Sequence, residues 1–301
     1  MNGILPLWKP RGMTSHDCVF KVRKLLRTKK VGHTGTLDPE VTGVLPLCIG
    51  RATKVAEYIT NGGKAYEGEV TIGRSTTTED AWGETVEETG VAESYTRKQI
   101  SDMLATFKGE ITQTPPMFSA VKVNGKRLYE YAREGKTIER PSRKVIIHDI
   151  ELLDDREIFE GETISFKFRV SCSKGTYIRT LAVEMGEKMG YPAHMSELKR
   201  IRSAAFEEKD CITFEELEGL IETEQVAETL YPIETGISHL PKWDISDTLA
   251  MKVKNGAVLD MPKEWPGDQV AMNHEGKTLA IYQAHPEKQG IIKPVKVLFN
   301  D

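Results

Sequence analysis

The sequence contains few cysteines and no long apolar run. Its 301 residues include four scattered cysteines, Cys18, Cys48, Cys172 and Cys211, with no C-x-x-C pair. This spacing argues against a disulfide framework and a cysteine zinc site, so we expect no metal. No stretch of about 18 apolar residues exists to cross a membrane, so we expect no membrane association. The N-terminus also lacks the apolar region of a secretion signal. We therefore expect a cytoplasmic protein with reduced thiols.

Several cofactor and repeat motifs are also missing. The sequence has no P-loop, no dinucleotide-binding fingerprint and no H-E-x-x-H zinc motif. It has no internal repeat and no low-complexity segment, which excludes solenoids and disordered scaffolds. The composition, 39% hydrophobic and 29% charged, is typical of a globular protein. A chain of this length supports roughly two domains.

The charge is unevenly distributed along the chain, although the net charge is only −4. Residues 1–60 contain ten Lys or Arg and four Asp or Glu, and residues 121–144 contain eight and three. Acidic residues dominate two other stretches: six with no base in residues 75–93, and ten with one base in residues 207–234. This segregation suits a protein that presents a basic face to nucleic-acid phosphates. By charge alone, a solvated basic helix face explains it equally well.

Local patterns predict both helices and strands. Ser15 is positioned to cap a helix with one apolar and one basic side, and Thr96 with Gln99 forms a capping box for another. Residues 163–172 alternate as a half-buried strand, and residues 178–189 return to helical spacing. After a boundary near residues 231–242, short apolar runs separated by Gly and Pro predict a small C-terminal β module.

The segment richest in functional groups is residues 31–46, VGHTGTLDPEVTGVLP, which holds His33 and Asp38. An isolated Asp-Pro more often only starts a turn, and a lone histidine is more often structural. Three other loop-edge segments share this density of polar groups: KPRGMTS at 9–15, KAYE at 64–67 and SKGTYIRT at 173–180. Their recurrence favours a site over four unrelated turns.

In order, these segments resemble the motifs of the TruB family of tRNA pseudouridine synthases. KPRGMTS resembles the family's first motif, GHTGTLDPEVTGVLP its catalytic-aspartate motif, KAYEGEV its tyrosine motif and SKGTYIRTL its arginine motif. The region from about Trp243 resembles, more weakly, a PUA RNA-binding domain. The resemblance implies an α/β (α+β) catalytic domain over residues 1–240, with a mixed, largely antiparallel sheet and flanking helices. A PUA-like β-barrel is expected over residues 241–301.

The resemblance also implies an activity: isomerisation of uridine to pseudouridine at position 55 in the TΨC arm of tRNA. The reaction breaks the bond from N1 to C1′, turns the flipped base and joins C5 to C1′, without a cofactor or a metal. Asp38 aligns with the family's essential aspartate, either as nucleophile at C1′ or as a base at the 2′ position. Arg179 is assigned to keep Asp38 ionised. A phosphate contact or a simple helix-surface charge are the alternatives for Arg179.

The other site residues also rest on the resemblance. Tyr66 aligns with the family's active-site tyrosine, which stacks on uracil near C5, while Tyr177 and Leu198 align with pocket walls. His33 is expected to stack in the RNA when the target base leaves its loop. Lys9 is expected to brace the catalytic loop or to reach RNA. By spacing alone, Tyr66, Tyr177 and Leu198 would all be assigned to the core.

The expected partner is the TΨC stem-loop of tRNA, clamped by the basic and aromatic residues 121–144 and contacted by a second basic surface at residues 15–30. We expect a monomer with no obligate protein partner. Three alternatives stay open: a catalytically silent RNA-binding protein, a zinc-dependent tRNA base-exchange transglycosylase, and a relative that needs a guide RNA. The scattered cysteines argue against the second of these.

Overall fold

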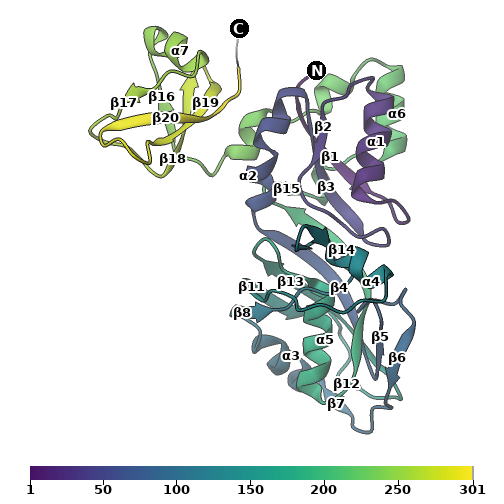
Figure 1. Cartoon of the computed structure of the whole chain (residues 1–301). Helices are drawn as coiled ribbons and strands as arrows, with labels where there is room; N and C mark the ends of the chain where they lie inside the picture. Colours follow the sequence, from purple (N-terminus) through teal and green to yellow (C-terminus); the bar gives the residue numbers. More distant parts are fainter. Residues whose placement is uncertain (300–301) are drawn as a thin grey trace. The chain divides into compact units, whose positions relative to one another are not determined.

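The computed structural model describes residues 1–299, which form two compact units. The first unit comprises Met1–Pro39, Val44–Asn61 and the chain from Ala204 onward. The second comprises Glu40–Gly43 and Gly62–Ser203. Figure 1 shows the elements of both units, coloured along the sequence. Within the described residues, no helix is long and apolar enough to cross a membrane.

The second unit is built on an antiparallel sheet flanked by helices. Its elements are β4 (Lys64–Ile72), β5 (Arg74–Thr76), β6 (Thr85–Glu88), β7 (Tyr95–Thr96), α3 (Arg97–Ala105), β8 (Gly109–Gln113), β9 (Lys122–Val123), β10 (Lys126–Arg127), α4 (Leu128–Arg133), β11 (Arg143–Leu152), β12 (Ile158–Phe159), β13 (Ile164–Cys172), α5 (Ile178–Met189) and β14 (Ala193–Ser203). The strands lie in the order β14, β4, β13, β11, β8, and each neighbouring pair is antiparallel. Helix α5 packs against β14, and α3 packs against β11 (Figure 1).

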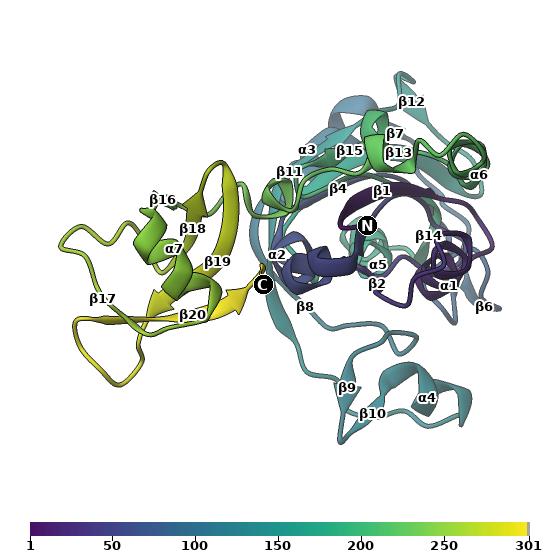
Figure 2. The same cartoon turned by 90° about the horizontal axis from the view of Figure 1, so that it is seen from above.

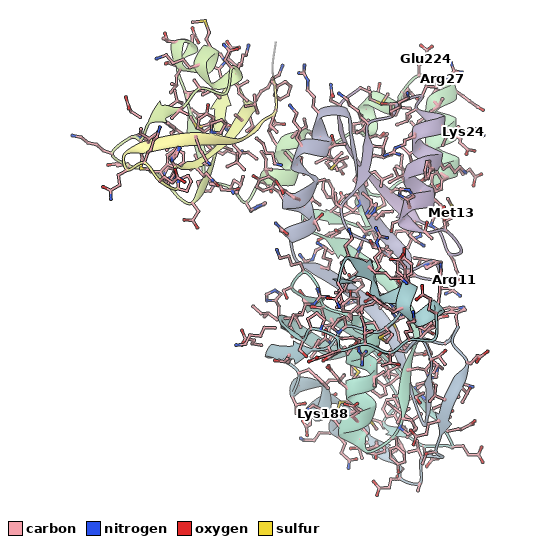
Figure 3. All side chains as sticks on the ribbon, in the orientation of Figure 1. Arg11, Met13, Lys24, Arg27, Lys188 and Glu224 are labelled. Atoms are coloured by element: carbon pink, nitrogen blue, oxygen red, sulfur yellow. The ribbon has the colours of Figure 1, made fainter. Side chains whose placement is uncertain are left out.

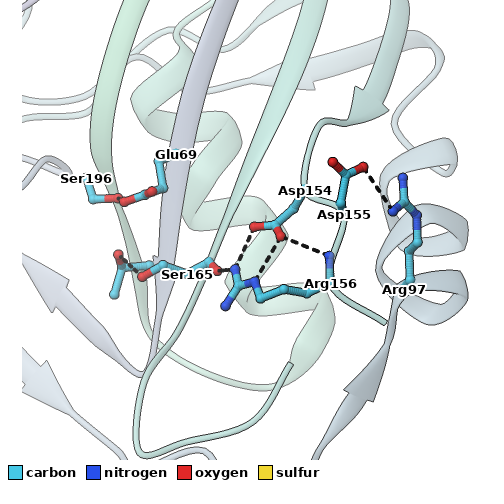
Figure 4. A network of polar contacts seen from close by, with 8 residues as sticks. Glu69, Arg97, Asp154, Asp155, Arg156, Ser165 and Ser196 are labelled. Carbon is cyan, nitrogen blue, oxygen red and sulfur yellow. Dashed lines mark hydrogen bonds and ion pairs between the residues drawn. The ribbon is translucent and has the colours of Figure 1, made fainter. Parts of the chain in front are cut away.

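Alternation along the strands separates an apolar face of this sheet from a polar one. Val70 and Phe166 are opposite each other and fully buried, as the alternating pattern of residues 163–172 predicts. On the polar face, Glu69 accepts a hydrogen bond from Ser196 at 2.8 Å. Figure 4 shows this contact beside the ion pair of Arg156 with Asp154. The apolar face therefore carries the core of the unit.

A long connection between β8 and β11 carries β9, β10 and α4. We call residues 114–142 the β8–β11 connection, and Figure 2 shows it extending away from those two strands. Asn124 and Gly125, both with positive φ, make the two-residue turn between β9 and β10. The guanidinium groups of Arg127 and Arg133 lie 5.8 and 5.2 Å from the ring centroid of Tyr129. The connection thus presents cations beside aromatic rings.

The first unit is built from segments early and late in the sequence. Its elements are β1 (Gly3–Lys9), α1 (Ser15–Leu25), β2 (Val31–His33), β3 (Thr42–Ile49), η1 (Gly50–Val55), α2 (Ala56–Asn61), β15 (Phe206–Glu207), η2 (Glu208–Asp210), α6 (Phe214–Glu222), η3 (Val226–Thr229), η4 (Ile233–Ile237), β16 (Lys242–Asp244), α7 (Asp247–Lys254), β17 (Leu259–Asp260), β18 (Gln269–His274), β19 (Lys277–Ala284) and β20 (Ile291–Val297). Strand β1 bonds to segments from late in the chain: the Ile4 and Tyr231 main chains exchange two hydrogen bonds, and the Trp8 amide donates to Ile212.

The start of α1 differs from the prediction. Thr14, not Ser15, is the N-cap: its hydroxyl accepts from the Asp17 amide, and the Asp17 carboxylate accepts from the Thr14 amide in return. Asp17 lies three residues after Thr14, the spacing of a capping box, so Thr14 makes two bonds there. Ser15 is buried and bonds elsewhere. The predicted cap of Thr96 with Gln99 is confirmed.

The predicted C-terminal β module is confirmed as a mixed five-stranded sheet in the order β16, β18, β19, β20, β17. Helix α7 packs on β19 and β18 and closes a small core that contains Val253 and Tyr282. The other side of the module joins the main core of the first unit, because Ala271 and Ile281 belong to the same buried cluster as Ile59. The Tyr58 hydroxyl donates to Gln269 Oε1 at 2.8 Å. The module is thus packed into the first unit.

Candidate active site

The loop that carries Asp38 is held on both sides of the aspartate. On one side, the Ser15 hydroxyl accepts a hydrogen bond from the Leu37 amide at 2.8 Å and donates to the Leu37 carbonyl at 3.3 Å. On the other side, the carbonyl of Pro39 accepts from the Gly12 amide at 2.9 Å. Leu37 itself is buried, whereas Asp38 is partly exposed. The carboxylate therefore projects from a backbone that has little freedom to move.

The Lys9 side chain also holds this loop in place. It is fully buried, and Nζ donates to the carbonyls of Pro10 and Pro39, each at 2.9 Å. Burying an ammonium group costs free energy unless hydrogen bonds satisfy its protons. Loss of either carbonyl partner would leave part of the buried charge unsatisfied. Through its bond to Pro39, Lys9 therefore holds the main chain next to Asp38.

His33 ends β2, where it pairs with Leu47 of β3. Its Nδ1 accepts a hydrogen bond from the Gly35 amide at 3.4 Å, and its side chain is partly exposed. Between His33 and Asp38, the buried Thr34 hydroxyl donates to the Pro46 carbonyl at 3.0 Å. His33 and Asp38 thus belong to one pinned loop of the first unit.

In the second unit, Tyr66 and Leu198 share one face of the sheet. Tyr66 on β4 is opposite Arg200 of β14, and Leu198 is opposite Gly68, two positions further along. Directly opposed residues of antiparallel strands project to the same side. The absence of a side chain at Gly68 makes room there, because a Cβ would lie 3.1 Å from Leu198 Cδ1. Tyr66 is 9% exposed, so little of its side chain is accessible to solvent.

Tyr177 stands at the start of α5 as its N-cap. The guanidinium of Arg143 lies 4.8 Å from the centroid of its ring. Gln113, which is fully buried, bonds to both polar groups of the Tyr177 main chain. The ring and the backbone of this residue are therefore both held by the strands β8 and β11.

Arg179 lies in the first turn of α5 and is 6% exposed. Its Nη1 donates to the Thr78 carbonyl and its Nη2 to the Phe118 carbonyl, each at 2.9 Å. Asp80 Oδ2 lies 3.7 Å from Nη1. These bonds orient the guanidinium within the second unit and bring the β8–β11 connection to the start of α5.

Positive charge accompanies the candidate residues in both units. Lys64, two residues before Tyr66, is buried; burial and the nearby positive charge of Arg200 lower its pKa to about 8. In the first unit, three basic residues are exposed: Arg11 before α1, Lys24 on α1 and Arg27 just after it (Figure 3). Within residues 1–299, no group of three or more His, Cys, Asp or Glu side chains is placed to hold a metal ion.

Two residues that shape these surroundings were not predicted. Ser15 was assigned to a helix cap, and Gln113 was not singled out. Each makes its key contacts with residues 22 or 64 positions away. No local pattern marks such partners.

The comparisons with known proteins agree with the resemblance. Residues 23–178 match the model for the TruB family pseudouridylate synthase N-terminal domain, and residues 179–238 match the tRNA pseudouridylate synthase B C-terminal domain. The tRNA pseudouridine synthase B of Bacillus pumilus is 58% identical, covering 100% of this chain and 99% of that protein. The protein of the same name from Bacillus subtilis is 57% identical, covering 99% and 98%.

Solved structures share the fold. A chain in the crystal structure of a Cbf5–Nop10–Gar1 complex is 31% identical with a TM-score of 0.75, covering 99% of this chain and 85% of that one. The expected pseudouridine synthase fold, with a mixed and largely antiparallel sheet, is thus confirmed. The chain belongs to the TruB family and is a pseudouridine synthase, an enzyme that isomerises uridine.

Proposed function

We propose that this enzyme converts uridine to pseudouridine at position 55, in the TΨC arm of tRNA. The observation that carries the proposal is the 58% identity, over the whole chain, to a protein named tRNA pseudouridine synthase B. The four motifs, which include Asp38, Tyr66 and Arg179, support the same substrate class. We further propose that the chain works as a monomer without a protein partner or a guide RNA.

Asp38 is the proposed catalytic carboxylate. Isomerisation leaves the redox state unchanged, so the enzyme must only release the base from C1′, let it turn and rejoin it through C5. One ionised carboxylate acting on the ribose, at C1′ or at the 2′ position, suffices. The bonds from Ser15, Gly12 and Lys9 to the neighbours of Asp38 support this role, because a pre-positioned group loses little entropy on reaching the transition state.

Tyr66, Tyr177 and Leu198 are the proposed walls of the uracil pocket. The common face of Tyr66 and Leu198 supports a flat base stacking against them. Because C5 must lose a proton after it bonds to C1′, the Tyr66 hydroxyl is the proposed group beside C5. Arg179 is proposed to keep Asp38 ionised, and His33 to stack where the flipped base leaves its loop.

Residues 121–144, most of which lie in the β8–β11 connection, are the proposed clamp on the stem-loop, and residues 15–30 are the proposed second basic surface. Arg127 and Arg133 beside Tyr129 offer cations for phosphates and a ring for unstacked bases. The module of β16–β20 is proposed as a PUA-like domain that adds remote contacts to the tRNA. The division into a catalytic domain, residues 1–240, and this domain, residues 241–301, stays a proposal about function.

The purified chain, alone, should modify an unmodified tRNA transcript that carries tritium at C5 of its uridines. Each isomerisation releases one C5 hydrogen, so tritium release counts turnovers. A matched transcript with cytidine at position 55 is the control and should release none. Release from the control would overturn the assignment of position 55. An inactive chain that gains activity with added guide RNA would overturn the proposal that it acts alone.

A further inference from the structure

Gln113 holds the main chain of Tyr177 at both of its polar groups. Gln113 is the last residue of β8, and its side chain is fully buried. Oε1 accepts a hydrogen bond from the Tyr177 amide at 3.0 Å, and Nε2 donates to the Tyr177 carbonyl at 3.2 Å. Nε2 also lies 3.4 Å from Glu184 Oε2 on α5. A primary amide accepts through its oxygen and donates through its nitrogen, so its orientation is set by its partners.

This contact fixes the main chain at the start of a helix that has no side-chain cap. Tyr177 is the N-cap of α5 but makes no side-chain cap hydrogen bond. Gln113 bonds to the amide and the carbonyl of the N-cap residue itself, and not to the amides of the first turn, which have no partner within the helix. Gln113 fixes the entry into α5 from outside, through strand β8, and so sets where the Tyr177 ring and the first turn begin.

The neighbouring strand contacts the same residue. Arg143, which begins β11, is directly opposite Gln113 in the β8–β11 pairing, and its guanidinium lies 4.8 Å from the Tyr177 ring centroid. The two residues that bound the β8–β11 connection therefore contact Tyr177 together, one at its backbone and one at its ring. Within the connection, the Phe118 carbonyl accepts from Arg179, two residues beyond Tyr177.

We propose that Gln113 is a positioning residue for the isomerisation, which fixes the Tyr177 backbone and through it the uracil-facing ring and the start of α5. The inference rests on the proposed function, in which Tyr177 lines the uracil pocket. Gln113 itself touches no substrate in this proposal. Its loss should therefore slow the chemical step and leave the affinity for tRNA unchanged.

The test compares Gln113→Met with the control Thr114→Val in the full chain. Methionine keeps the length and volume but bonds to neither group of Tyr177. Thr114→Val removes the adjacent side-chain hydrogen bond to Ser142, which lies 2.8 Å away, and leaves Tyr177 untouched. Single-turnover rate constants are measured with enzyme in excess over the tritiated transcript, and the Kd for tRNA is measured by filter binding. A misfolded fraction lowers the active concentration but not the saturated rate constant, so the rate constant reports on positioning.

We expect Gln113→Met to lower the saturated rate constant by roughly tenfold or more, with Kd unchanged and Thr114→Val at the parent rate. A parental rate for Gln113→Met, or an equal loss for Thr114→Val, would overturn the proposal. Should Gln113→Met fail to fold, Gln113→Asn decides, because it keeps a primary amide but is one methylene shorter, so it does not hold both groups of Tyr177 at the present distances. A slower rate for Gln113→Asn supports positioning, and a parental rate overturns it. An inactive parent enzyme would instead mean that the proposed function is wrong.

Discussion

Ser15 Oγ and the main chain of Leu37 are joined by two hydrogen bonds, one accepted at 2.8 Å and one donated at 3.3 Å. Leu37 immediately precedes Asp38, so the start of α1 fixes the direction in which the Asp38 side chain leaves the loop. The geometry of the loop that carries Asp38 therefore depends on Ser15, which takes no part in the proposed chemistry.

Ser15→Ala should therefore lower the isomerisation rate as well as the stability. Leaving the buried Leu37 amide unpaired costs about 1–3 kcal/mol of unfolding free energy, measured by urea titration. Thr14→Ala is the matched control, because it removes the N-cap at a cost of about 1 kcal/mol and keeps the contacts to Leu37. Equal single-turnover rates for the two variants would contradict a positioning effect of Ser15.

Asp38→Asn, which is nearly isosteric, should reduce isomerisation by about 100-fold or more, because it removes the ionised carboxylate. The Kd for tRNA should stay close to that of the parent, since the basic surfaces supply the binding. Tritium release and filter binding measure the two quantities. Glu40→Gln changes the same charge two residues later and serves as the control. An isomerisation rate of Asp38→Asn within about tenfold of the parent rate would contradict the catalytic role of Asp38.

Tyr66→Phe keeps the ring and removes the hydroxyl, so it separates stacking from proton transfer. A hydroxyl that helps the proton leave C5 should contribute about 100-fold to the rate, and its loss should appear in kcat rather than in KM. Tyr58→Phe removes a hydroxyl bonded to Gln269 and is the control for stability alone. An unaltered kcat for Tyr66→Phe would leave Tyr66 as a stacking platform only.

Patterns in the chain predicted those parts of the fold that local chemistry determines. The capping box of Thr96 with Gln99 and the strand Ile164–Cys172 depend on neighbours a few residues away. The family resemblance supplied the motif residues. The cap at Thr14 was missed because Ser15, next to it, is also a residue type that caps helices. Only Thr14 has an acidic residue, Asp17, three positions later, and the two form a capping box. Gln113 and Ser15 contact residues far away in the sequence, and such contacts produce no periodic pattern in the local sequence.

The C-terminal module should be tested by charge removal rather than by deletion. Ala271, Ile281 and Leu298 share a buried cluster with Ile59, so removing residues 243–301 would expose apolar surface and lower the melting temperature. Replacing the exposed Lys252, Lys277 and Lys288 by Gln avoids this loss.

We expect this triple variant to raise KM with kcat unchanged. The slope of log Kd against log salt should become shallower by about 0.7–0.9 for each phosphate that the variant no longer neutralises. Lys98→Gln on α3 is the control for unspecific charge effects. An unchanged slope and KM in the triple variant would show that these lysines do not contact the tRNA.

Glu184 makes the stability depend on pH. Burial, above all, raises its pKa from 4.5 to about 7. Between pH 4.5 and 7, Glu184 binds more protons in the folded chain than in the unfolded chain. The contribution of Glu184 to the free energy of unfolding is therefore fully present below pH 4.5 and is lost as the pH rises through 7. Glu184→Gln removes the titration and should flatten the fall in melting temperature between about pH 5 and 8. The variant should also be the more stable protein at the alkaline end. A parallel pH profile for the two proteins would contradict this assignment.

The exchange of hydrogen bonds between Ile4 and Tyr231 sets the order in which the chain can fold during synthesis. Strand β1 is made first, yet its partners Ile212 and Tyr231 emerge more than 200 residues later. Residues 62–203 of the second unit are, by contrast, continuous in sequence and complete long before the chain ends. Because contacts far apart in sequence form slowly, the second unit should fold during synthesis, before strand β1 pairs with its late partners.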